Sequence, residues 1–205
     1  MSIRIQHFGE HRQVPWKNGL GITREVISKP ASHGLAGFDW RISLATVGAS
    51  GPFSVFPGVD RTIAVLQGDG MQLTVDGHKE PPLTVGSMPF PFSGDAEVDA
   101  DCLGGETLDL NVMSLRGHFV HRMTKVIVSS AQTLPICEDM VAVVFRDDAL
   151  VTIDRVRLNV GLGDVLLGLE GQVDLEIEPH ASGSTLYTIA IAASSGQTAL
   201  GKQVA

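Results

Sequence analysis

Polar and apolar residues alternate in two stretches of the sequence, and the polar ones are of types that could bind or transform a small molecule. The stretches are FDWRISLATV (38–47) and LDLNVMSL (108–115), and such alternation in a β-strand puts the polar side chains on one face. The polar sets are Asp39, Arg41 and Ser43 in the first stretch and Asp109 and Asn111 in the second. If both line the interior of a barrel, with apolar Trp40, Leu108 and Leu110 outside it, Arg41 and Asp109 need partners, because a lone buried charge is costly. The alternative is two half-buried strands whose polar faces lie in water.

A third candidate region is VPWKNGLGITREV (14–26). Asn18-Gly19 is a strong signal for a tight turn, and Thr23 and Glu25 share one face of the strand expected to follow. A tryptophan, an amide, a hydroxyl and a carboxylate within ten residues suit the wall of a small-molecule pocket. The alternative interpretation of the same residues is a hairpin in which the tryptophan only packs. The residues of this wall are Trp16, Asn18, Thr23 and Glu25.

Arg61 is the expected anion anchor. It follows the Pro57-Gly58 turn and precedes the apolar run TIAVL, which places it at a strand start. Arginine is a permanent cation with a planar donor fork, so its natural partner is a carboxylate-bearing ligand. The alternative is a surface ion pair with Glu25 or Asp60. With Trp16 and Phe92 as apolar walls, the predicted ligand-binding set is Trp16, Asn18, Thr23, Glu25, Arg41, Arg61, Phe92, Asp109 and Asn111.

The histidines do not have the spacing of a metal site. A transition-metal centre of the common type needs about three histidines and a carboxylate on one ion. Of the seven histidines, His7, His11 and His33 precede the alternating stretches. Among the others only His118 and His121 lie close together, and a spacing of three puts them on opposite faces of a strand. The glycine-containing run Gly68-Asp69-Gly70 opens no helix, so it is a turn rather than a phosphate loop. We therefore expect no metal and no other cofactor, and we assign no catalytic residue.

The elements that position these residues are predicted to be strands. Ten β-branched-rich runs of four to ten residues are separated by Gly, Pro, Asp or Asn. They cover 38–47, 62–67, 71–77, 108–115, 125–130, 140–145, 149–154, 164–169, 173–178 and 186–192. The expected helical pieces are short turns before Trp16 and near Leu134. This pattern predicts an all-β sandwich or barrel.

The sequence also contains an internal repeat. Residues 63–77 align with 141–155 at an offset of 78, and residues 85–100 align with 162–177 at an offset of 77. A chance alignment of two hairpins is the alternative to two copies of one barrel unit. The repeat predicts domains at residues 1–117 and 118–205, joined by the segment around 117–139, with an N-terminal segment that crosses to the second barrel.

Composition narrows the functional classes. The 205 residues carry a net charge of −8, which repels nucleic acid. No run approaches the ~18 apolar residues of a membrane span, and the first residues lack the apolar core of a signal peptide. Only Cys102 and Cys137 occur, which favours free thiols in a reducing cytoplasm. We expect no membrane partner.

Four of these segments together resemble the HutD/Ves family. They are WKNGLGITRE (16–25), FDWRIS (38–43), GPFSVFPGVDR (51–61) and DLNVM (109–113), in the family's order and spacing. The likeness is clear from about residue 10 to residue 117 and looser beyond. One departure is Leu20, where many members have glycine, which should narrow the space above that turn. The resemblance implies a bicupin, which agrees with the internal repeat, and a role as an accessory protein of histidine utilisation or a stress-associated relative.

The family resemblance implies a ligand class but no firm activity. We expect a metal-free cupin that senses or buffers a small anionic metabolite, with formylglutamate, formiminoglutamate or urocanate as candidates. One alternative is a metal-independent isomerase or hydrolase that uses Glu25, Asp39 or Asp109 as its base. Another is a structural protein with a vestigial pocket, in which exposed barrel edges pair to form a homodimer.

Overall fold

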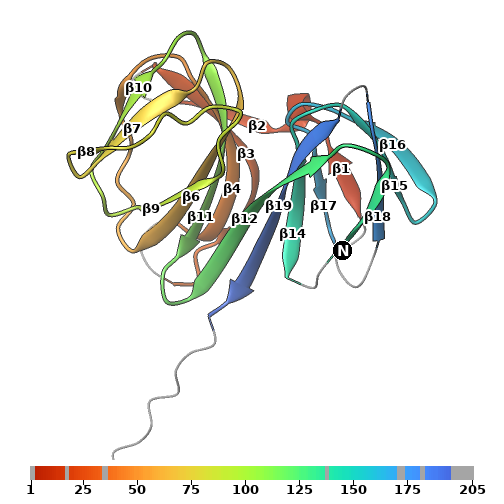
Figure 1. The fold of residues 1–205 in the computed structure, drawn as a ribbon. Helices are drawn as coiled ribbons and strands as arrows, with labels where there is room; N and C mark the ends of the chain where they lie inside the picture. Colours follow the sequence, from red (N-terminus) through yellow and green to blue (C-terminus); the bar gives the residue numbers. More distant parts are fainter. Residues whose placement is uncertain are drawn as a thin grey trace, which may run out of the picture.

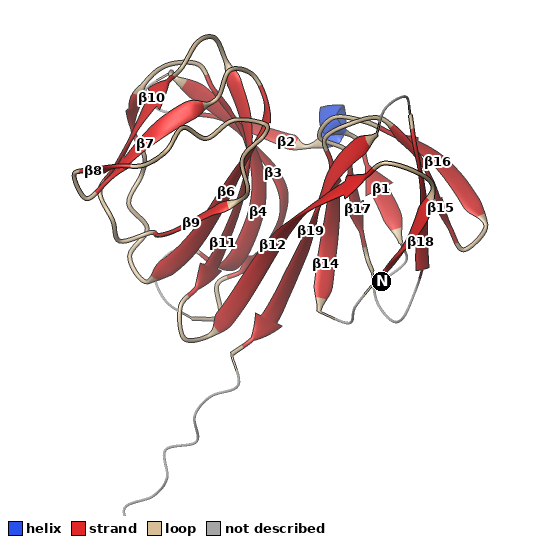
Figure 2. Cartoon of the chain, in the orientation of Figure 1, coloured by secondary structure: helices blue, strands red, loops and turns tan. Residues whose placement is uncertain are grey.

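The protein is built almost entirely from β-strands. The computed structural model describes residues 3–16, 19–33, 37–136, 139–169, 174–180 and 183–194. Within them it contains nineteen strands and one 3-10 turn, η1 (Phe8–Glu10) (Figures 1 and 2). The strands form four antiparallel sheets, two in each half of the chain.

The first half contains a six-stranded and a four-stranded sheet. The six-stranded sheet has the order β2 (Arg12–Pro15), β3 (Gly21–Pro30), β4 (Phe38–Val47), β11 (Thr107–Leu115), β6 (Val59–Gln67), β9 (Phe90–Ser93). The four-stranded sheet has the order β5 (Gly51–Pro52), β10 (Val98–Cys102), β7 (Met71–Val75), β8 (His78–Lys79). An apolar cluster that includes Ile63, Met71 and Leu73 fills part of the space between them.

The second half repeats this organisation. Its five-stranded sheet has the order β1 (Arg4–Gln6), β17 (Val165–Leu167), β14 (Met140–Phe145), β19 (Ser184–Ala193), β12 (Phe119–Val128). Its four-stranded sheet has the order β13 (Gln132–Pro135), β18 (Asp174–Pro179), β15 (Ala149–Ile153), β16 (Val156–Val160). Here an apolar cluster that includes Phe145, Leu166 and Leu175 packs in the interior.

The order of strands is the same in both halves. The run β4-β11-β6-β9 recurs as β12-β19-β14-β17, and β5-β10-β7-β8 recurs as β13-β18-β15-β16. The turns that follow β7 and β15 agree as well, since Asp76 and Asp154 both adopt a φ of 47°. Segments 63–77 and 141–155 therefore occupy corresponding strand–turn–strand positions, as the sequence alignment predicts.

The two halves share one core. Alternate residues of β4 and β11, including Ile42, Leu44, Leu108 and Leu110, pack in one cluster with residues of β12, β14, β17 and β19. Strand β1 adds a second link, because it pairs antiparallel with β17 and so lies in the five-stranded sheet of the other half (Figure 1). The large sheets thus stack on each other through their outward-facing apolar residues.

One sequence-based expectation about local structure is wrong. Leu134 lies in strand β13 rather than in a helical turn. The segment expected to join the halves contains the ten-residue strand β12, which pairs with β19 along its whole length. Residues 129–131 of the polar run connect β12 of the five-stranded sheet to β13 of the four-stranded sheet.

Two further observations concern cysteine and membrane segments. Cys102 is a free thiol, and Cys137 lies outside the described residues. Within the described part of the chain, no helix has the length and hydropathy needed to cross a membrane.

Candidate ligand-binding site

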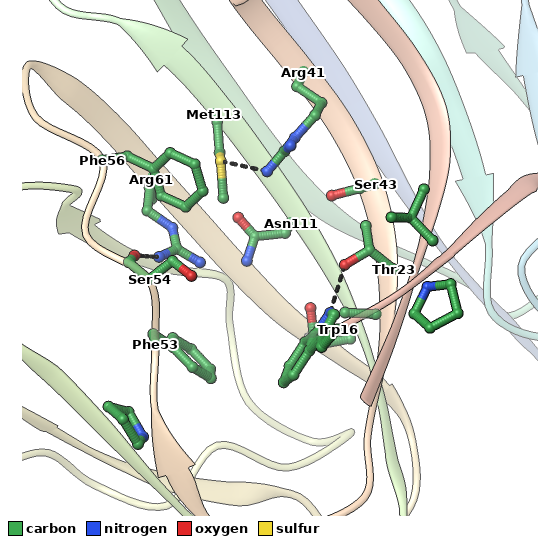
Figure 3. Close-up of a pocket in the computed structure, with 15 residues that line it drawn as sticks. Trp16, Thr23, Arg41, Ser43, Phe53, Ser54, Phe56, Arg61, Asn111 and Met113 are labelled. Carbon is green, nitrogen blue, oxygen red and sulfur yellow. Dashed lines mark hydrogen bonds between the residues drawn. The ribbon is translucent and has the colours of Figure 1, made fainter. Parts of the chain in front are cut away.

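A cavity of about 650 Å³ lies on the inner face of the six-stranded sheet. Its floor is formed by β4, β6 and β11, and its rim by the β2–β3 hairpin and the segment 52–56 (Figure 3). Six of the predicted site residues line it, namely Trp16, Thr23, Arg41, Arg61, Asp109 and Asn111. The sequence motifs that are far apart in the chain therefore meet in one place.

Strand register explains why these side chains meet. Asp109, Asn111 and Met113 occupy alternate positions of β11, so they point to the same face. Met113 lies opposite Arg41 of β4 on one side and Arg61 of β6 on the other. The other face of β11 carries Leu108, Leu110 and Val112, which pack in the shared core. The prediction that Trp40, Leu108 and Leu110 pack outside the lumen is confirmed.

Arg61 is buried, with 6% of its surface exposed, and it still faces the cavity. Its Nη1 donates a hydrogen bond to the carbonyl oxygen of Ser54 at 3.3 Å. The guanidinium lies 4.7 Å from the ring centre of Phe92, and 5.4 and 5.5 Å from those of Phe53 and Phe56. Burial lowers the pKa of Arg61 to about 10, so it remains a cation at neutral pH. The expected alternative of a surface ion pair is wrong, because Asp60 pairs with Arg116 at 2.7 Å instead.

Asp109 and Asn111 each have a buried acceptor oxygen to which no described residue donates a hydrogen bond. Asp109 is 1% exposed and Asn111 is 5% exposed. Among the described residues, neither Oδ1 of Asp109 nor Oδ1 of Asn111 has a hydrogen-bond partner. Burial raises the pKa of Asp109 to about 7, and the positive charge of Arg61 opposes that rise. Buried acceptors of this kind are costly unless a ligand or water satisfies them.

Arg41 is the second cation of the cavity. Its Nη2 contacts the Sδ of Met113 at 3.3 Å, and its guanidinium lies 4.7 Å from the ring centre of Phe38. Its Nε has no hydrogen-bond partner among the described residues. Burial lowers the pKa of Arg41, and the charge of Glu25 opposes this. In Figure 3 the side chains of Arg41, Arg61 and Asn111 point into the same space.

The β2–β3 hairpin supplies the opposite wall. The indole Nε1–H of Trp16 donates a hydrogen bond to Thr23 Oγ1 at 2.8 Å, which fixes the ring against β3. A Cβ on Gly21 would lie 2.6 Å from the carbonyl oxygen of Thr46 and 2.9 Å from the Trp16 ring. Only glycine lets the hairpin approach β4 this closely, which is a physical reason for the second glycine of the WKNGLG motif.

Two of the remaining predicted residues, Glu25 and Phe92, do not line the cavity. Glu25 accepts a hydrogen bond from Ser28 Oγ at 3.3 Å. Phe92 supports Arg61 from the neighbouring strand β9, where the two residues pair. Asn18 lies outside the described residues.

Asp39 does not face inward with Arg41, and that prediction is wrong. A bulge in the β3–β4 pairing skips Asp39, and its carboxylate accepts hydrogen bonds from the backbone N–H groups of Ser32 and His33 at 3.0 and 3.1 Å. The bulge reverses the alternation, so Phe38 instead packs with Met113. A bulge depends on strand pairing and carries no plain signal in one strand's sequence.

Sequence reasoning missed several residues of the wall. Ser43, Phe53, Phe56 and Met113 line the cavity, together with the carbonyl-bearing residue Ser54. Ser43 and Met113 stand at inward positions of the alternating stretches, and the two phenylalanines belong to the GPFSVFPG run. Alternation could have identified the first pair, whereas the loop phenylalanines face the cavity through loop geometry.

Three of the histidines form contacts with neighbouring side chains. His121 forms hydrogen bonds with Thr62 Oγ1 at 2.9 Å and with Ser114 Oγ at 2.7 Å, and His33 stacks on His118 at 4.2 Å. In the part of the chain that the structure describes, no group of three or more His, Cys, Asp or Glu residues is placed to hold a metal ion.

Comparison with known proteins identifies the family. The model of the HutD family matches residues 9–186. The chain belongs to the HutD family. The resemblance to HutD/Ves read from the sequence is thus confirmed, and it extends through most of the second half.

Individual relatives agree with this assignment. An uncharacterized 21.2 kDa protein in the hutC 3' region of Pseudomonas putida is 42% identical over 138 residues, which cover 65% of this chain and 72% of the relative. The protein Ves of Citrobacter koseri is 39% identical over 110 residues, 49% of this chain and 52% of Ves. The structure of HutD from Pseudomonas fluorescens SBW25 matches with a TM-score of 0.77 and 32% identity, covering 94% of this chain and 99% of that one.

More distant structures show the fold class. A cupin 2 conserved barrel domain protein from Leptotrichia buccalis has a TM-score of 0.59 at 12% identity, over 92% of this chain and 96% of that one. The chain is therefore an all-β protein of the HutD family with cupin-like structural neighbours.

Proposed function

We propose that the cavity binds a small anionic metabolite without a metal ion, and that the protein is an accessory or regulatory component of histidine utilisation. One observation carries the proposal: Arg61 is buried against three aromatic rings, keeps its charge, and lines the cavity. Its Nε has no hydrogen-bond partner among the described residues. A buried arginine with unused donors is suited to a carboxylate.

The link to histidine utilisation rests on the family. HutD membership and the hutC-region relative both support it. The candidate ligands are formylglutamate, formiminoglutamate and urocanate, each of which carries a carboxylate. A cavity of about 650 Å³ falls within the range of ~300–1,000 Å³ that is typical of small-molecule sites. An open cavity also disfavours the alternative of a vestigial pocket packed shut by its own side chains.

We further propose that the architecture is a bicupin with units at about residues 1–117 and 118–205. The recurrence of strand order in the two halves supports it, as do the cupin-like neighbours. The pairing of β1 with β17 supports an exchange of the N-terminal strand between the units. In this arrangement the first unit carries the cavity, whereas apolar side chains fill the second.

The second candidate function is a metal-independent enzyme, and Asp109 is the observation that favours it. A carboxyl group with a pKa of about 7 in a ligand-sized cavity has the properties of a general acid or base. Glu25 and Asp39 do not line the cavity. Incubation of each candidate metabolite with the protein, followed by NMR, distinguishes the two functions: turnover that is lost in Asp109→Asn establishes the enzyme.

A thermal-shift screen of the three metabolites tests the proposed function. A ligand at 100 times its dissociation constant stabilises the folded state by about 2.7 kcal/mol, which raises the melting temperature measurably. We expect at least one metabolite to stabilise the wild type and to leave Arg61→Ala unchanged. If none shifts the wild type at millimolar concentration, the proposal is wrong.

A further inference from the structure

The polar groups of the cavity are arranged by charge along strand β11. Met113 lies between Arg41 and Arg61 in the pairing of the three strands, so one end of the cavity carries two cations. Asn111 lies one inward position further along β11, and Asp109 lies two positions further. Four residues of a strand, the separation of Asp109 and Met113, span about 13 Å. The long arginine side chains shorten the distance that a ligand must span between the cations and Asp109. The cavity therefore has a cationic end and an acceptor end.

The atoms without partners divide in the same way. At the cationic end they are donors, Nε of Arg41 and Nε of Arg61. At the other end they are acceptors, Oδ1 of Asp109 and Oδ1 of Asn111. The four residues that carry these atoms all line the cavity, and the atoms themselves are buried without a hydrogen-bond partner among the described residues. A ligand with hydrogen-bond acceptors at both ends would satisfy only the arginine donors. Its second acceptor oxygen would then lie against the carboxyl group of Asp109.

Among the residues that the structure describes, no cation forms an ion pair with Asp109. Arg61 acts on it through space, yet burial still raises the pKa of Asp109 to about 7. Lys29, a further cation of the same half, lies by Asp39 at 3.7 Å, and Arg116 pairs with Asp60 and Asp95. Neither of these cations lines the cavity. A positive group on the ligand would complete the acceptor end.

We propose that the ligand is amphoteric, with a carboxylate held by Arg61 at one end and a protonated nitrogen group held by Asp109 and Asn111 at the other. This inference rests on the proposed function, because it assumes that the cavity binds a small carboxylate. Among the three candidates it selects formiminoglutamate over formylglutamate. These two compounds have the same shape and differ at one terminus, where a protonated amidine nitrogen replaces a carbonyl oxygen.

Calorimetric titration of the wild type with the two compounds at pH 7.5 provides the test. Hydrogen bonds to charged groups are worth more than neutral ones, so formiminoglutamate should bind at least about tenfold more tightly. In Asp109→Asn the preference should vanish, because an amide pairs as well with a carbonyl as with an amidine. Circular dichroism and a melting curve establish that the variant is folded, and the wild-type comparison stands without it.

Arg61→Ala separates this inference from the function on which it rests. Loss of the carboxylate anchor should weaken both compounds by the same factor, whereas Asp109→Asn should weaken only the amidine. Equal affinity of the wild type for both compounds, or tighter binding of formylglutamate, overturns the amphoteric ligand and leaves the anion site standing. If neither compound binds the wild type, the proposed function fails and this inference fails with it.

Discussion

At the scale of single residues, the burial of the charged Arg61 side chain needs a physical explanation. A guanidinium that leaves water loses hydration, and among the described residues Arg61 regains one hydrogen bond, from Nη1 to the Ser54 carbonyl oxygen. The rings of Phe53, Phe56 and Phe92 compensate in part, because each cation–π contact contributes roughly 0.5–2 kcal/mol. These contacts hold the guanidinium beside the cavity, which Arg61 lines. The residue is thus held in place before the ligand arrives.

Asp109→Asn should change how stability depends on pH. The pKa of Asp109 is raised from 3.8 to about 7 in the folded protein, so stability that this carboxyl contributes at low pH is lost as pH rises from about 4 to about 7. Asparagine cannot ionise, so the variant should be the more stable protein at pH 8, by up to about 4 kcal/mol. Urea unfolding at pH 4.5 and pH 8 measures this. Identical pH profiles of the two proteins would contradict the buried, unpaired carboxyl.

Some site residues could be predicted from sequence because their signal is local. Arg41, Asp109 and Asn111 alternate with large apolar residues, and alternation fixes the face once the element is a strand. Asp39 shows the limit, since a bulge set by pairing with β3 moved it to the loop at Ser32. Phe53 and Phe56 belong to a loop, where the period of two does not apply. Their facing depends on how the loop crosses the cavity.

At the scale of elements, the β2–β3 hairpin depends on Gly21. In Gly21→Ala the new Cβ would meet the Thr46 carbonyl oxygen and the Trp16 ring, so the hairpin must move away from β4. We expect a loss of about 1–3 kcal/mol in unfolding free energy, as in overpacked sites, and weaker ligand binding through displacement of Trp16. Chemical denaturation and calorimetry measure the two effects.

Gly105→Ala is the matched control for this substitution. A Cβ at Gly105 would meet nothing within 4 Å, so the same chemical change should leave stability and binding close to those of the wild type. A Gly21→Ala protein that is as stable as Gly105→Ala would show that the hairpin does not need the close approach.

Most central strands could be predicted from their sequence, whereas edge strands could be predicted less well. The runs at 38–47 and 140–145 match β4 and β14 residue for residue, because buried central strands are rich in β-branched and apolar residues. Strand β9 contains Pro91, strand β16 contains Arg157 and Asn159, and all their residues except Val160 are half-exposed or exposed. They are strands because a neighbour pairs with them. That information lies in the partner's sequence as much as in their own.

At the scale of the whole molecule, the shared core predicts one cooperative unfolding transition. Residues of both halves pack in a single cluster, and β1 of the first half completes a sheet of the second. Both tryptophans, Trp16 and Trp40, lie in the first half, whereas far-UV circular dichroism reports on the strands of both. Urea midpoints from tryptophan fluorescence and from circular dichroism should coincide. Two separated transitions would mean that the halves fold independently.

The central claim is that Arg61 anchors the carboxylate of a small metabolite, and calorimetric affinity for formylglutamate in Arg61 variants tests it most directly. The account predicts that Arg61→Ala loses about tenfold to a hundredfold in affinity, since charge-assisted hydrogen bonds contribute roughly 1.5–3 kcal/mol. Arg61→Lys should recover only part, because a point charge cannot form the bidentate pair. The control is Arg157→Ala, which removes an exposed arginine that pairs with Glu178 and does not line the cavity. Equal affinity of the wild type and all three variants would contradict the account.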